Sequence, residues 1–250
     1  MRASPARLSF DLLKSVAQPH LNALSDDELL NRFVAGDENC FRALVARYTP
    51  LVWGVCSRSL ATTQDAEDAF QATFLVLFRK AAGLDRRGHL SLWLYGVARK
   101  AALRVRTSVA RRREVPVDSL AAVAESTVEP DREFSRVLEE EIARLPESLR
   151  RPFILCRLQD NTYAEAAKIL GCSVATVCRR VDRAIVRLRD RLSGRGIAPT
   201  CSIGGVLVLE GISKAAPPSL ADTVASLLAG SPSQAAIAVA DSLCRSLVPW

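Results

Sequence analysis

The sequence predicts an all-α protein in which two helical domains are joined by a flexible linker and followed by a C-terminal extension. Apolar residues recur at the i, i+3, i+4 spacing of helices from about residue 25 to 113 and again from about 134 to 192. No alternating strand pattern competes with this spacing. Between the two regions, small, polar and acidic residues with Pro116 and Pro130 have the composition of a linker. A chain of 250 residues is long enough for two such domains.

The first domain is expected over residues 25–113, after an N-terminal extension of residues 1–24. Gly36 and Asp37 separate its first two helices, and the polar residues 62–65 supply an N-cap for the fourth. Residues 83–91 are expected to form a loop before a basic helix. The predicted helices of this domain are 29–34, 41–48, 51–55, 66–78 and about 92–112.

The linker is expected over residues 114–133 and the second domain over residues 134–193. The extension that follows, 194–250, is rich in Gly, Ala, Ser and Pro. Within it, residues 220–228 and 234–247 have an amphipathic pattern. We expect these two segments to form helices that pack on the protein itself or on a partner.

The composition favours a polyanionic partner and offers no metal site. The net charge is +7 and the isoelectric point about 9.3, which suits nucleic acid because Lys and Arg near phosphates release counterions. A mildly basic protein without such a role is the alternative. The seven cysteines form no CxxC pair and the two histidines lie far from them, so we expect neither zinc nor another cofactor.

The cysteine pattern also bears on location. An odd number of cysteines without a disulfide framework fits a reducing compartment. The first 20 residues have no apolar core of signal-peptide length, and no apolar run approaches the roughly 20 residues that cross a bilayer. We therefore expect a cytoplasmic protein.

Residues 161–192 carry the pattern of a DNA-binding helix-turn-helix. Thr162 and Glu165 form a capping box at the start of a short helix, and Gly171 can end that helix in the left-handed conformation. Ser173 can then cap the next helix. Two helices joined by a short turn that contains glycine are typical of this motif.

The second helix of this motif separates an apolar face from a basic face. The buried face is expected to contain Val174, Val177, Val181, Ala184, Ile185, Leu188 and Leu192. The opposite face holds Thr176, Arg179, Arg180, Arg183 and Arg187. A helix fits the major groove of DNA, where arginine can donate two hydrogen bonds to guanine and further arginines can contact phosphates. The alternative is a surface helix whose basic face is merely solvated.

Two segments of the first domain could carry function. Asp65, Glu67 and Asp68, followed by Gln71, begin the fourth helix; they either stabilise its N-terminus or, for Asp65 and Asp68, belong to a metal-dependent nuclease. The nuclease is disfavoured because no further carboxylates converge there. The other segment, 93–106, combines aromatic and basic residues, which in single-strand binding proteins stack on bases and follow the backbone. Its aromatic residues could equally be core residues, with Leu94, Val97 and Leu103 buried beside them.

Three stretches in this order resemble the extracytoplasmic-function family of bacterial sigma factors. DAEDAFQATFLVLF at 65–78 resembles the polymerase-binding helix of that family, and WLYGVARKAALRVR at 93–106 resembles the helix that melts and reads the −10 promoter element. Residues 145–192 resemble the domain that reads the −35 element. The resemblance implies a domain like sigma region 2 over 25–113 and a helix-turn-helix domain like sigma region 4 over 134–193.

The resemblance also implies roles for individual residues. The residues that would face the clamp helices of the polymerase β′ subunit are Asp65, Glu67, Asp68 and Gln71. Those that would bind the −10 element are Trp93, Arg99, Lys100, Arg104 and Arg106, while the loop at 83–91 would hold a flipped base. Those that would enter or flank the −35 major groove are Ser173, Thr176, Arg179, Arg180, Arg183 and Arg187.

The chain departs from the family pattern at three places. Ala72 stands where the family often has an acidic residue, which would alter the polymerase contact. Pro152 lies inside a predicted helix and is tolerable if that helix begins nearby, because proline suits a first turn. The extension at 194–250 is not part of the minimal family pattern, so we expect its deletion to leave polymerase binding intact.

The leading hypothesis is a sigma factor without catalytic activity that binds core RNA polymerase through its β′ and β subunits and directs it to promoter DNA. An anti-sigma factor is a further candidate partner. A stand-alone helix-turn-helix regulator would instead bind an operator tightly without polymerase, as a dimer on a palindrome. Under the nuclease hypothesis, alanine at Asp65 or Asp68 would abolish cleavage.

Overall fold

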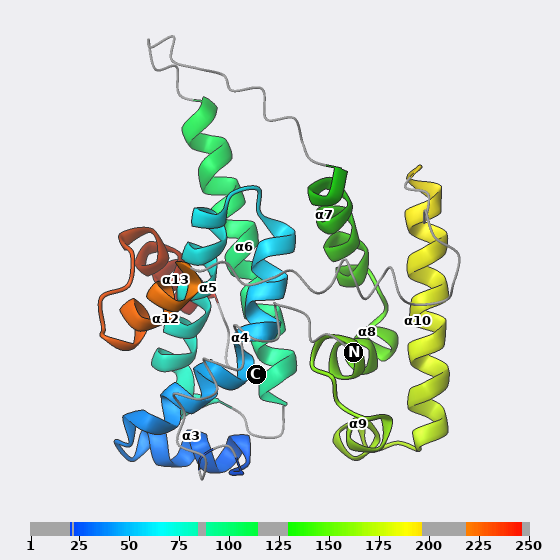
Figure 1. Ribbon diagram of the computed structural model, residues 1–250, viewed down its shortest axis with the longest axis horizontal. Coiled ribbons are helices and arrows are strands. Elements are labelled where there is room, and N and C mark those ends of the chain that lie inside the picture. Colours follow the sequence, from blue (N-terminus) through cyan, green and yellow to red (C-terminus); the bar gives the residue numbers. More distant parts are fainter. Residues whose placement is uncertain (1–20, 22, 85–88, 115–129, 197–218, 247–250) are drawn as a thin grey trace, which may run out of the picture.

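The computed structural model describes residues 21, 23–84, 89–114, 130–196 and 219–246, and every regular element in these ranges is a helix. The first half contains α3 (Asp26–Val34), α4 (Glu38–Ser59), α5 (Thr63–Lys80), the 3₁₀ turn η1 (Ala81–Gly83) and α6 (Leu90–Glu114). The second half contains α7 (Pro130–Ala143), α8 (Glu147–Phe153), the π-helical turn η2 (Ile154–Leu158), α9 (Tyr163–Leu170) and α10 (Val174–Gly194). The C-terminal extension contributes α12 (Ser219–Leu228) and α13 (Gln234–Ser246) (Figure 1).

The expected helix boundaries of the first half are set by side-chain caps. Ser25 and Glu28 form a capping box at the start of α3. Asp37 accepts a hydrogen bond from the backbone N–H of Asn39 at 3.0 Å to begin α4, and Thr62 caps α5 in the same way. Gly36, between α3 and α4, has a φ of +107°, a backbone conformation that glycine adopts without steric cost. The predicted separators are confirmed.

The two helices predicted at 41–48 and 51–55 are a single helix, so that prediction was wrong. Pro50 lies inside α4, where it removes one backbone hydrogen bond and costs about 3 kcal/mol or more. The helix nevertheless continues because residues on both sides of the proline are buried in the core, among them Val45, Leu51 and Val52. Burial of each such side chain contributes about 1.5–3 kcal/mol, which offsets the proline.

The basic helix α6 begins at Leu90, two residues earlier than expected, and runs to Glu114. Leu94 and Val97 are buried as predicted, whereas Leu103 is 50% exposed and that prediction was wrong. Leu103 lies on the outward side of α6, beside the exposed Arg104. The loop predicted to hold a flipped base falls partly on residues 85–88, which lie outside the described residues.

In the second half, α7 begins at Pro130, inside the segment predicted as linker. Proline fits there because the first residue of a helix needs no intrahelical N–H bond. The expected linker core, 115–129, and the expected N-terminal extension up to residue 20 lie outside the described residues. Pro152 is the sixth residue of α8, past its first turn, and the helix changes to π geometry two residues later. The sequence-based account of Pro152 was therefore wrong.

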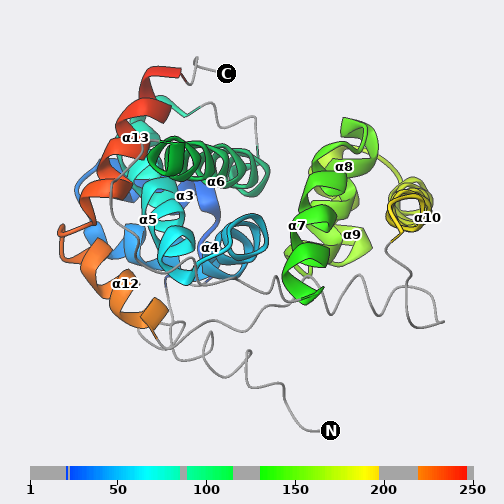
Figure 2. The ribbon, with the colours of Figure 1, turned by 90° about the horizontal axis from the view of Figure 1, so that it is seen from above.

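One hydrophobic core connects the two halves. It includes Leu44 and Val52 of α4, Leu138 and Ile142 of α7, and Leu188 of α10. α7 lies against α4, and α10 lies on the far side of α7 and α8 (Figure 2). A smaller cluster fills the space between α9 and the first half of α10. The two predicted domains thus pack against each other.

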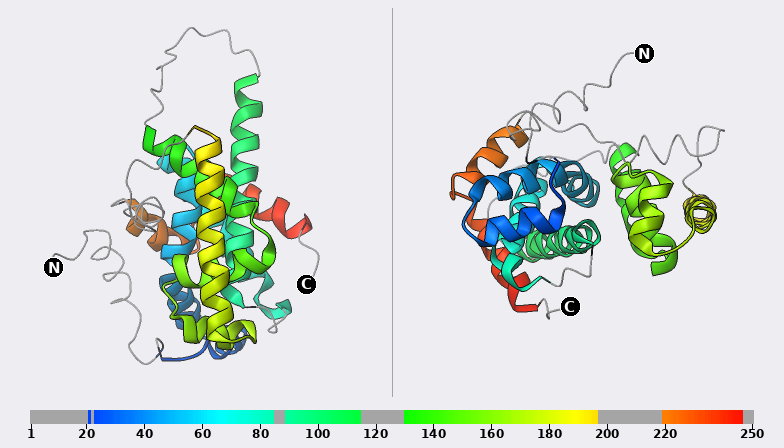
Figure 3. Two further views of the ribbon diagram at one scale, coloured as in Figure 1. Left: turned by 90° about the vertical axis from the view of Figure 1, so that its right-hand side faces the viewer. Right: turned by 90° about the horizontal axis from the view of Figure 1, so that it is seen from below.

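Helices α12 and α13 confirm the two amphipathic segments predicted in the extension. Both pack on α5, and α13 also contacts α6, on the side of the first half that faces away from α7–α10 (Figures 2 and 3). No helix in the described part of the chain combines the length and the apolar composition that crossing a bilayer requires.

Candidate polymerase and DNA interfaces

The helix-turn-helix has the local geometry that its sequence predicts. The backbone N–H of Thr162 donates to Glu165 Oε2 at 2.8 Å, and the N–H of Glu165 donates to Thr162 Oγ1 at 3.2 Å. Gly171 ends α9 with φ 61° and ψ 37°, in the left-handed region. Ser173 then accepts a hydrogen bond from the N–H of Thr176 at 3.2 Å and begins α10. The turn is therefore fixed by local chemistry.

α10 buries one face and exposes its arginines on another. Val177, Val181, Ala184, Leu188 and Leu192 are buried as predicted, and Ile185 is partly buried. Val174 is 49% exposed, so its assignment to the buried face was wrong. It is the first residue of α10, where the helix emerges from the turn.

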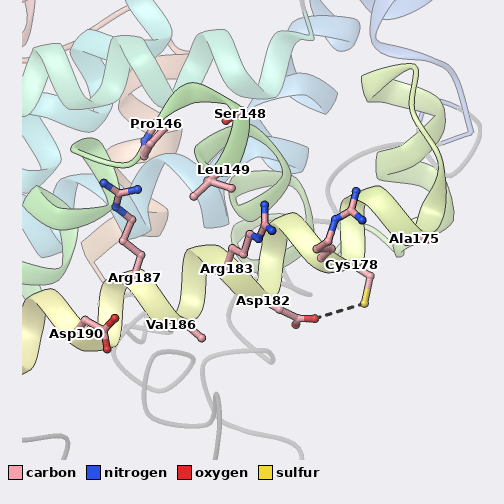
Figure 4. Close-up of a pocket in the computed structure, with 11 residues that line it drawn as sticks. Pro146, Ser148, Leu149, Ala175, Cys178, Asp182, Arg183, Val186, Arg187 and Asp190 are labelled. Carbon is pink, nitrogen blue, oxygen red and sulfur yellow. Dashed lines mark hydrogen bonds between the residues drawn. The ribbon is translucent and has the colours of Figure 1, made fainter.

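Three of the predicted −35 residues, Arg179, Arg183 and Arg187, form an exposed row along α10. Ser173, Arg179, Arg183 and Arg187 are exposed, while Thr176 and Arg180 are partly buried. Arg179, Arg183 and Arg187 line a groove of about 860 Å³ between α10 and the start of α8. Figure 4 shows Arg183 and Arg187 extending from α10 toward Leu149 and Pro146. Such a row can donate hydrogen bonds to base edges and phosphates.

Two carboxylates lie beside this arginine row. Asp182 and Asp190 line the same groove, and Asp182 accepts a hydrogen bond from the thiol of Cys178 at 3.7 Å. Farther along the chain, Arg191 and Arg195 leave the row and contact Glu140 and Glu141 of α7, at 2.8–3.2 Å. The end of α10 is therefore attached to α7 by ion pairs. The row of exposed arginines that line the groove ends at Arg187.

The acidic residues at the start of α5 and the nearby Gln71 differ in their exposure to solvent. Asp65 and Glu67 are partly exposed, and Asp65 takes part in the N-cap of α5 through Thr62. Asp68 and Gln71 are only 9% and 6% exposed. Burial raises the pKa of Asp68, although a hydrogen bond from Ser233 acts in the opposite direction. Nothing in the sequence pattern indicated that the extension would contact these two residues.

The charged −10 residues of α6 are exposed and point to more than one side of the helix. Arg99, Lys100, Arg104 and Arg106 are all exposed. Arg104 donates hydrogen bonds to Ser242 and Ser246 of α13, and Arg106 lies 3.5 Å from Glu140. Trp93 is partly buried against the core, so the core interpretation and the DNA-binding interpretation of this residue remain compatible.

Tyr95 belongs to the core and forms part of a site that sequence reasoning missed. Its hydroxyl donates to Glu139 Oε1 at 2.8 Å, and Arg58 donates to Glu139 Oε2 through Nε at 2.9 Å. Arg58 comes from α4 and Glu139 from α7, 81 residues later. His89, which precedes α6, also contacts the second half: its Nε2 lies 2.8 Å from the carbonyl oxygen of Ile169 in α9. A buried Arg–Glu pair has no local sequence signature.

The described residues contain no group of three or more His, Cys, Asp or Glu side chains that could hold a metal ion. Asp68, one of the two carboxylates of the nuclease hypothesis, is instead hydrogen-bonded to Ser233. The site therefore offers charged surfaces for binding, with acidic residues on α5 and basic residues on α6 and α10.

Two family models match the chain. The model described as Sigma-70 region 2 matches residues 44–113, and the model described as Sigma-70, region 4 matches residues 135–188. These matches cover the helices that carry the acidic and basic surfaces described above.

Curated relatives show the same family. The chain is 30% identical over 165 residues to the ECF RNA polymerase sigma factor SigM of Mycobacterium tuberculosis, covering 66% of this chain and 83% of the relative. It is 29% identical over 183 residues to the ECF RNA polymerase sigma-E factor of Haemophilus influenzae, covering 68% and 96%. A solved structure of CnrH in complex with the cytosolic domain of CnrY is 22% identical and covers 68% of this chain and 97% of its own, with a TM-score of 0.40. The extent of the match to these curated relatives places the chain in the extracytoplasmic-function (ECF) family of RNA polymerase sigma factors.

Proposed function

We propose that this sigma factor binds core RNA polymerase through the first turns of α5, contacts the −10 element through α6 and reads the −35 element through α10. As a member of its family it directs promoter-specific initiation of transcription. The observation that carries the residue assignments is the one-sided row of exposed arginines on α10, which follows a capped helix-turn-helix. Such a row supplies both base-reading and phosphate-binding groups.

Each proposed role is assigned to a separate range of residues. Residues 25–113 would form the polymerase-binding and −10 domain, and residues 134–193 the −35 domain. Residues 1–24, 114–133 and 194–250 would be an N-terminal extension, a linker and a C-terminal extension. In support of this division, the acidic residues lie on α5 and the two basic surfaces on α6 and α10.

We propose further that the protein has no catalytic activity of its own and needs no cofactor. It would act by binding alone. The acidic part of α5 would contact the β′ subunit of the polymerase, and the −35 domain would lie near the β subunit. Because its partners are core polymerase and promoter DNA, we expect it to act in the cytoplasm. An anti-sigma factor stays a candidate partner on the family resemblance alone.

The test is equilibrium binding of cognate core polymerase to the wild-type chain and to the Asp65→Ala/Asp68→Ala variant. We expect the variant to bind at least tenfold more weakly, because a charge-complementary contact is lost. The matched control is Asp27→Ala/Glu38→Ala, which removes two exposed carboxylates from the first turns of α3 and α4 and should bind as wild type does.

Equal binding by both double variants would move the polymerase contact away from α5. Tight, specific binding of a DNA palindrome without polymerase would instead support a stand-alone regulator. Promoter-specific transcription with the reconstituted holoenzyme completes the test, since a sigma factor gives a defined start site only in the presence of core polymerase.

A further inference from the structure

The turn between α12 and α13 lies directly on two of the proposed polymerase contacts. The backbone N–H of Ser233 donates to Gln71 Oε1 at 2.7 Å, and the Ser233 hydroxyl donates to Asp68 Oδ1 at 2.5 Å. The same hydroxyl accepts the N–H of Ala236 at 3.0 Å and so caps α13. The carboxylate of Asp68 therefore sits at the N-terminus of α13, where the helix dipole favours a negative charge. These contacts join residues 162 and 165 positions apart.

Apolar side chains extend this contact along α5. Leu220, Val224 and Leu227 of α12 are buried in the main core. So are Ala236, Ala240 and Leu243 of α13, which follow one another at the spacing of a single helix face. α13 packs against α5 (Figures 1 and 2). The extension thus covers the α5 face opposite the rest of the first half.

Two polar contacts hold the far end of α13. Asp241 pairs with Arg79 at the end of α5, with 2.5 Å between Oδ1 and Nη1. Ser242 and Ser246 accept hydrogen bonds from Arg104 of α6, one of the proposed −10 residues. The extension therefore contacts both proposed interfaces of the first half, the polymerase face of α5 and the DNA face of α6.

We propose that α12 and α13 are an intramolecular cover that competes with core polymerase for Asp68 and Gln71. The inference rests on the proposed role of α5. Ser233 occupies Asp68 Oδ1 and Gln71 Oε1, and both side chains are less than 10% exposed, so a polymerase subunit cannot reach them while the cover is docked. Asp65 and Glu67 stay partly exposed and can make the first contact.

Ala72 fits this arrangement. It is completely buried and lies four residues after Asp68 and seven before Arg79, so all three share one side of α5. Both of its neighbours on that side contact the extension. A charged side chain at this position would be buried without a partner when the cover docks, which is unfavourable.

The cover works by lowering the fraction of binding-competent molecules. Because the extension is part of the same chain, its docking does not depend on protein concentration. If the cover is docked in about nine molecules of ten, the apparent affinity for polymerase falls about tenfold, and release of the cover restores it.

The test compares core-polymerase binding by full-length variants that change only α13. Ala240→Glu places a charge in the buried side of α13 and should undock the cover, whereas Ala238→Glu places the same charge on its exposed side. We expect Ala240→Glu to bind core polymerase several-fold to tenfold more tightly than wild type, and Ala238→Glu to bind as wild type does. Equal affinity of all three proteins would overturn the cover.

A third variant separates failure of the cover from failure of the proposed function. Asp68→Ala in the Ala240→Glu background should lose the gained affinity, because the uncovered carboxylate makes the contact. If Ala240→Glu binds more tightly but is insensitive to Asp68→Ala, the cover acts but the proposed polymerase contact is wrong. If Asp68→Ala weakens binding while Ala240→Glu equals wild type, the contact stands and the cover is overturned.

Hydrogen exchange of the wild-type chain provides a measurement that does not depend on how the variants fold. In the free protein the backbone amides of α13 should be protected, and in the complex with core polymerase they should exchange faster. Unchanged or greater protection of residues 234–246 in the complex would overturn the proposal.

Discussion

At the scale of single residues, Glu139 makes a buried polar contact between the two halves. Arg58, Tyr95 and Glu139 are 2%, 4% and 3% exposed, and the carboxylate accepts hydrogen bonds from the other two side chains. Burial and the charge of Glu139 raise the pKa of Tyr95 well above its usual range, so the phenol stays a donor. Gly54 leaves room for Arg58, since a Cβ there would lie 2.9 Å from Nη1.

Removal of this carboxylate should be strongly destabilising. Glu139→Ala removes the carboxylate that pairs with the buried Arg58 guanidinium, and we expect a loss of about 3–5 kcal/mol in the free energy of unfolding. Glu133→Ala, on the same helix, removes an exposed carboxylate that pairs with Arg136 and should cost at most about 1 kcal/mol. Urea denaturation of the two variants measures both values. Similar midpoints would show that the buried pair does not hold the halves together.

Asp68 should make stability depend on pH. Its pKa is raised by burial, so its contribution to folding is complete below the unfolded-state pKa of about 3.9 and is lost as the pH rises through the folded-state value. At neutral pH the buried charge is a net cost, and Asp68→Asn should raise the unfolding temperature. The gain should shrink as the pH falls from neutral to 4, because protonation of Asp68 in the wild type increases over that range. Thermal unfolding at both pH values checks this, with Asp27→Asn, at an exposed site, as a control without such a difference.

At the scale of elements, the arginines of α10 fall into a group that lines an open groove and a group that pairs with α7. Arg179, Arg183 and Arg187 face the open groove, whereas Arg191 and Arg195 bind the carboxylates of α7. The first group is open to solvent and belongs to the proposed −35 surface. The turn that precedes α10 sets the direction of this row, because the capped residues Thr162 and Ser173 and the left-handed Gly171 fix how the two helices meet.

Arg183→Ala should therefore weaken promoter recognition more than a change elsewhere on α10. If Arg183 contacts a base, we expect a loss of about 1–3 kcal/mol in discrimination at one −35 position. If it contacts a phosphate, binding should weaken uniformly and the salt dependence should decrease. Arg189→Ala is the matched control, because this exposed arginine lies six residues later and faces another side of the helix. Transcription from promoters with single −35 substitutions measures the difference, and equal effects of both variants would contradict the assignment.

At the scale of the whole molecule, the packing of the two halves conflicts with simultaneous recognition of both promoter elements. Elements centred at −35 and −10 are about 25 base pairs apart, or roughly 85 Å at 3.4 Å per base pair. In the structure, residues of α4 and α10 belong to one hydrophobic core. If α6 and α10 contact the two elements at the same time, as proposed, α7–α10 must separate from α3–α6, which costs the contacts around Glu139.

Energy transfer between labels at Ser108 of α6 and Arg189 of α10, both exposed positions, should report this separation. We expect high transfer in the free protein and a large decrease in the holoenzyme bound to promoter DNA. The Glu139→Ala variant should show lower transfer in the free state. Unchanged transfer in the promoter complex would mean that the halves stay together, and that only one element is read.

The sequence by itself determined what depends on neighbours within a few positions. Helix caps at Ser25, Thr62 and Thr162, the turn at Gly171 and the arginine row of α10 follow from residues three or four apart, because backbone hydrogen bonds and helical spacing are local. The amphipathic segments of the extension were predictable for the same reason.

Only the tertiary structure decided what depends on contacts between distant segments. Helix α4 tolerates Pro50 because residues on both sides of the proline are buried in the core. The pairing of Arg58 with Glu139 spans 81 positions, and the contact between Asp68 and Ser233 spans 165. Local patterns carry no information about such pairs, since their energy comes from the shared burial of groups that the chain brings together only on folding. For this reason the sequence identified the acidic residues of α5 but not the segment that covers them.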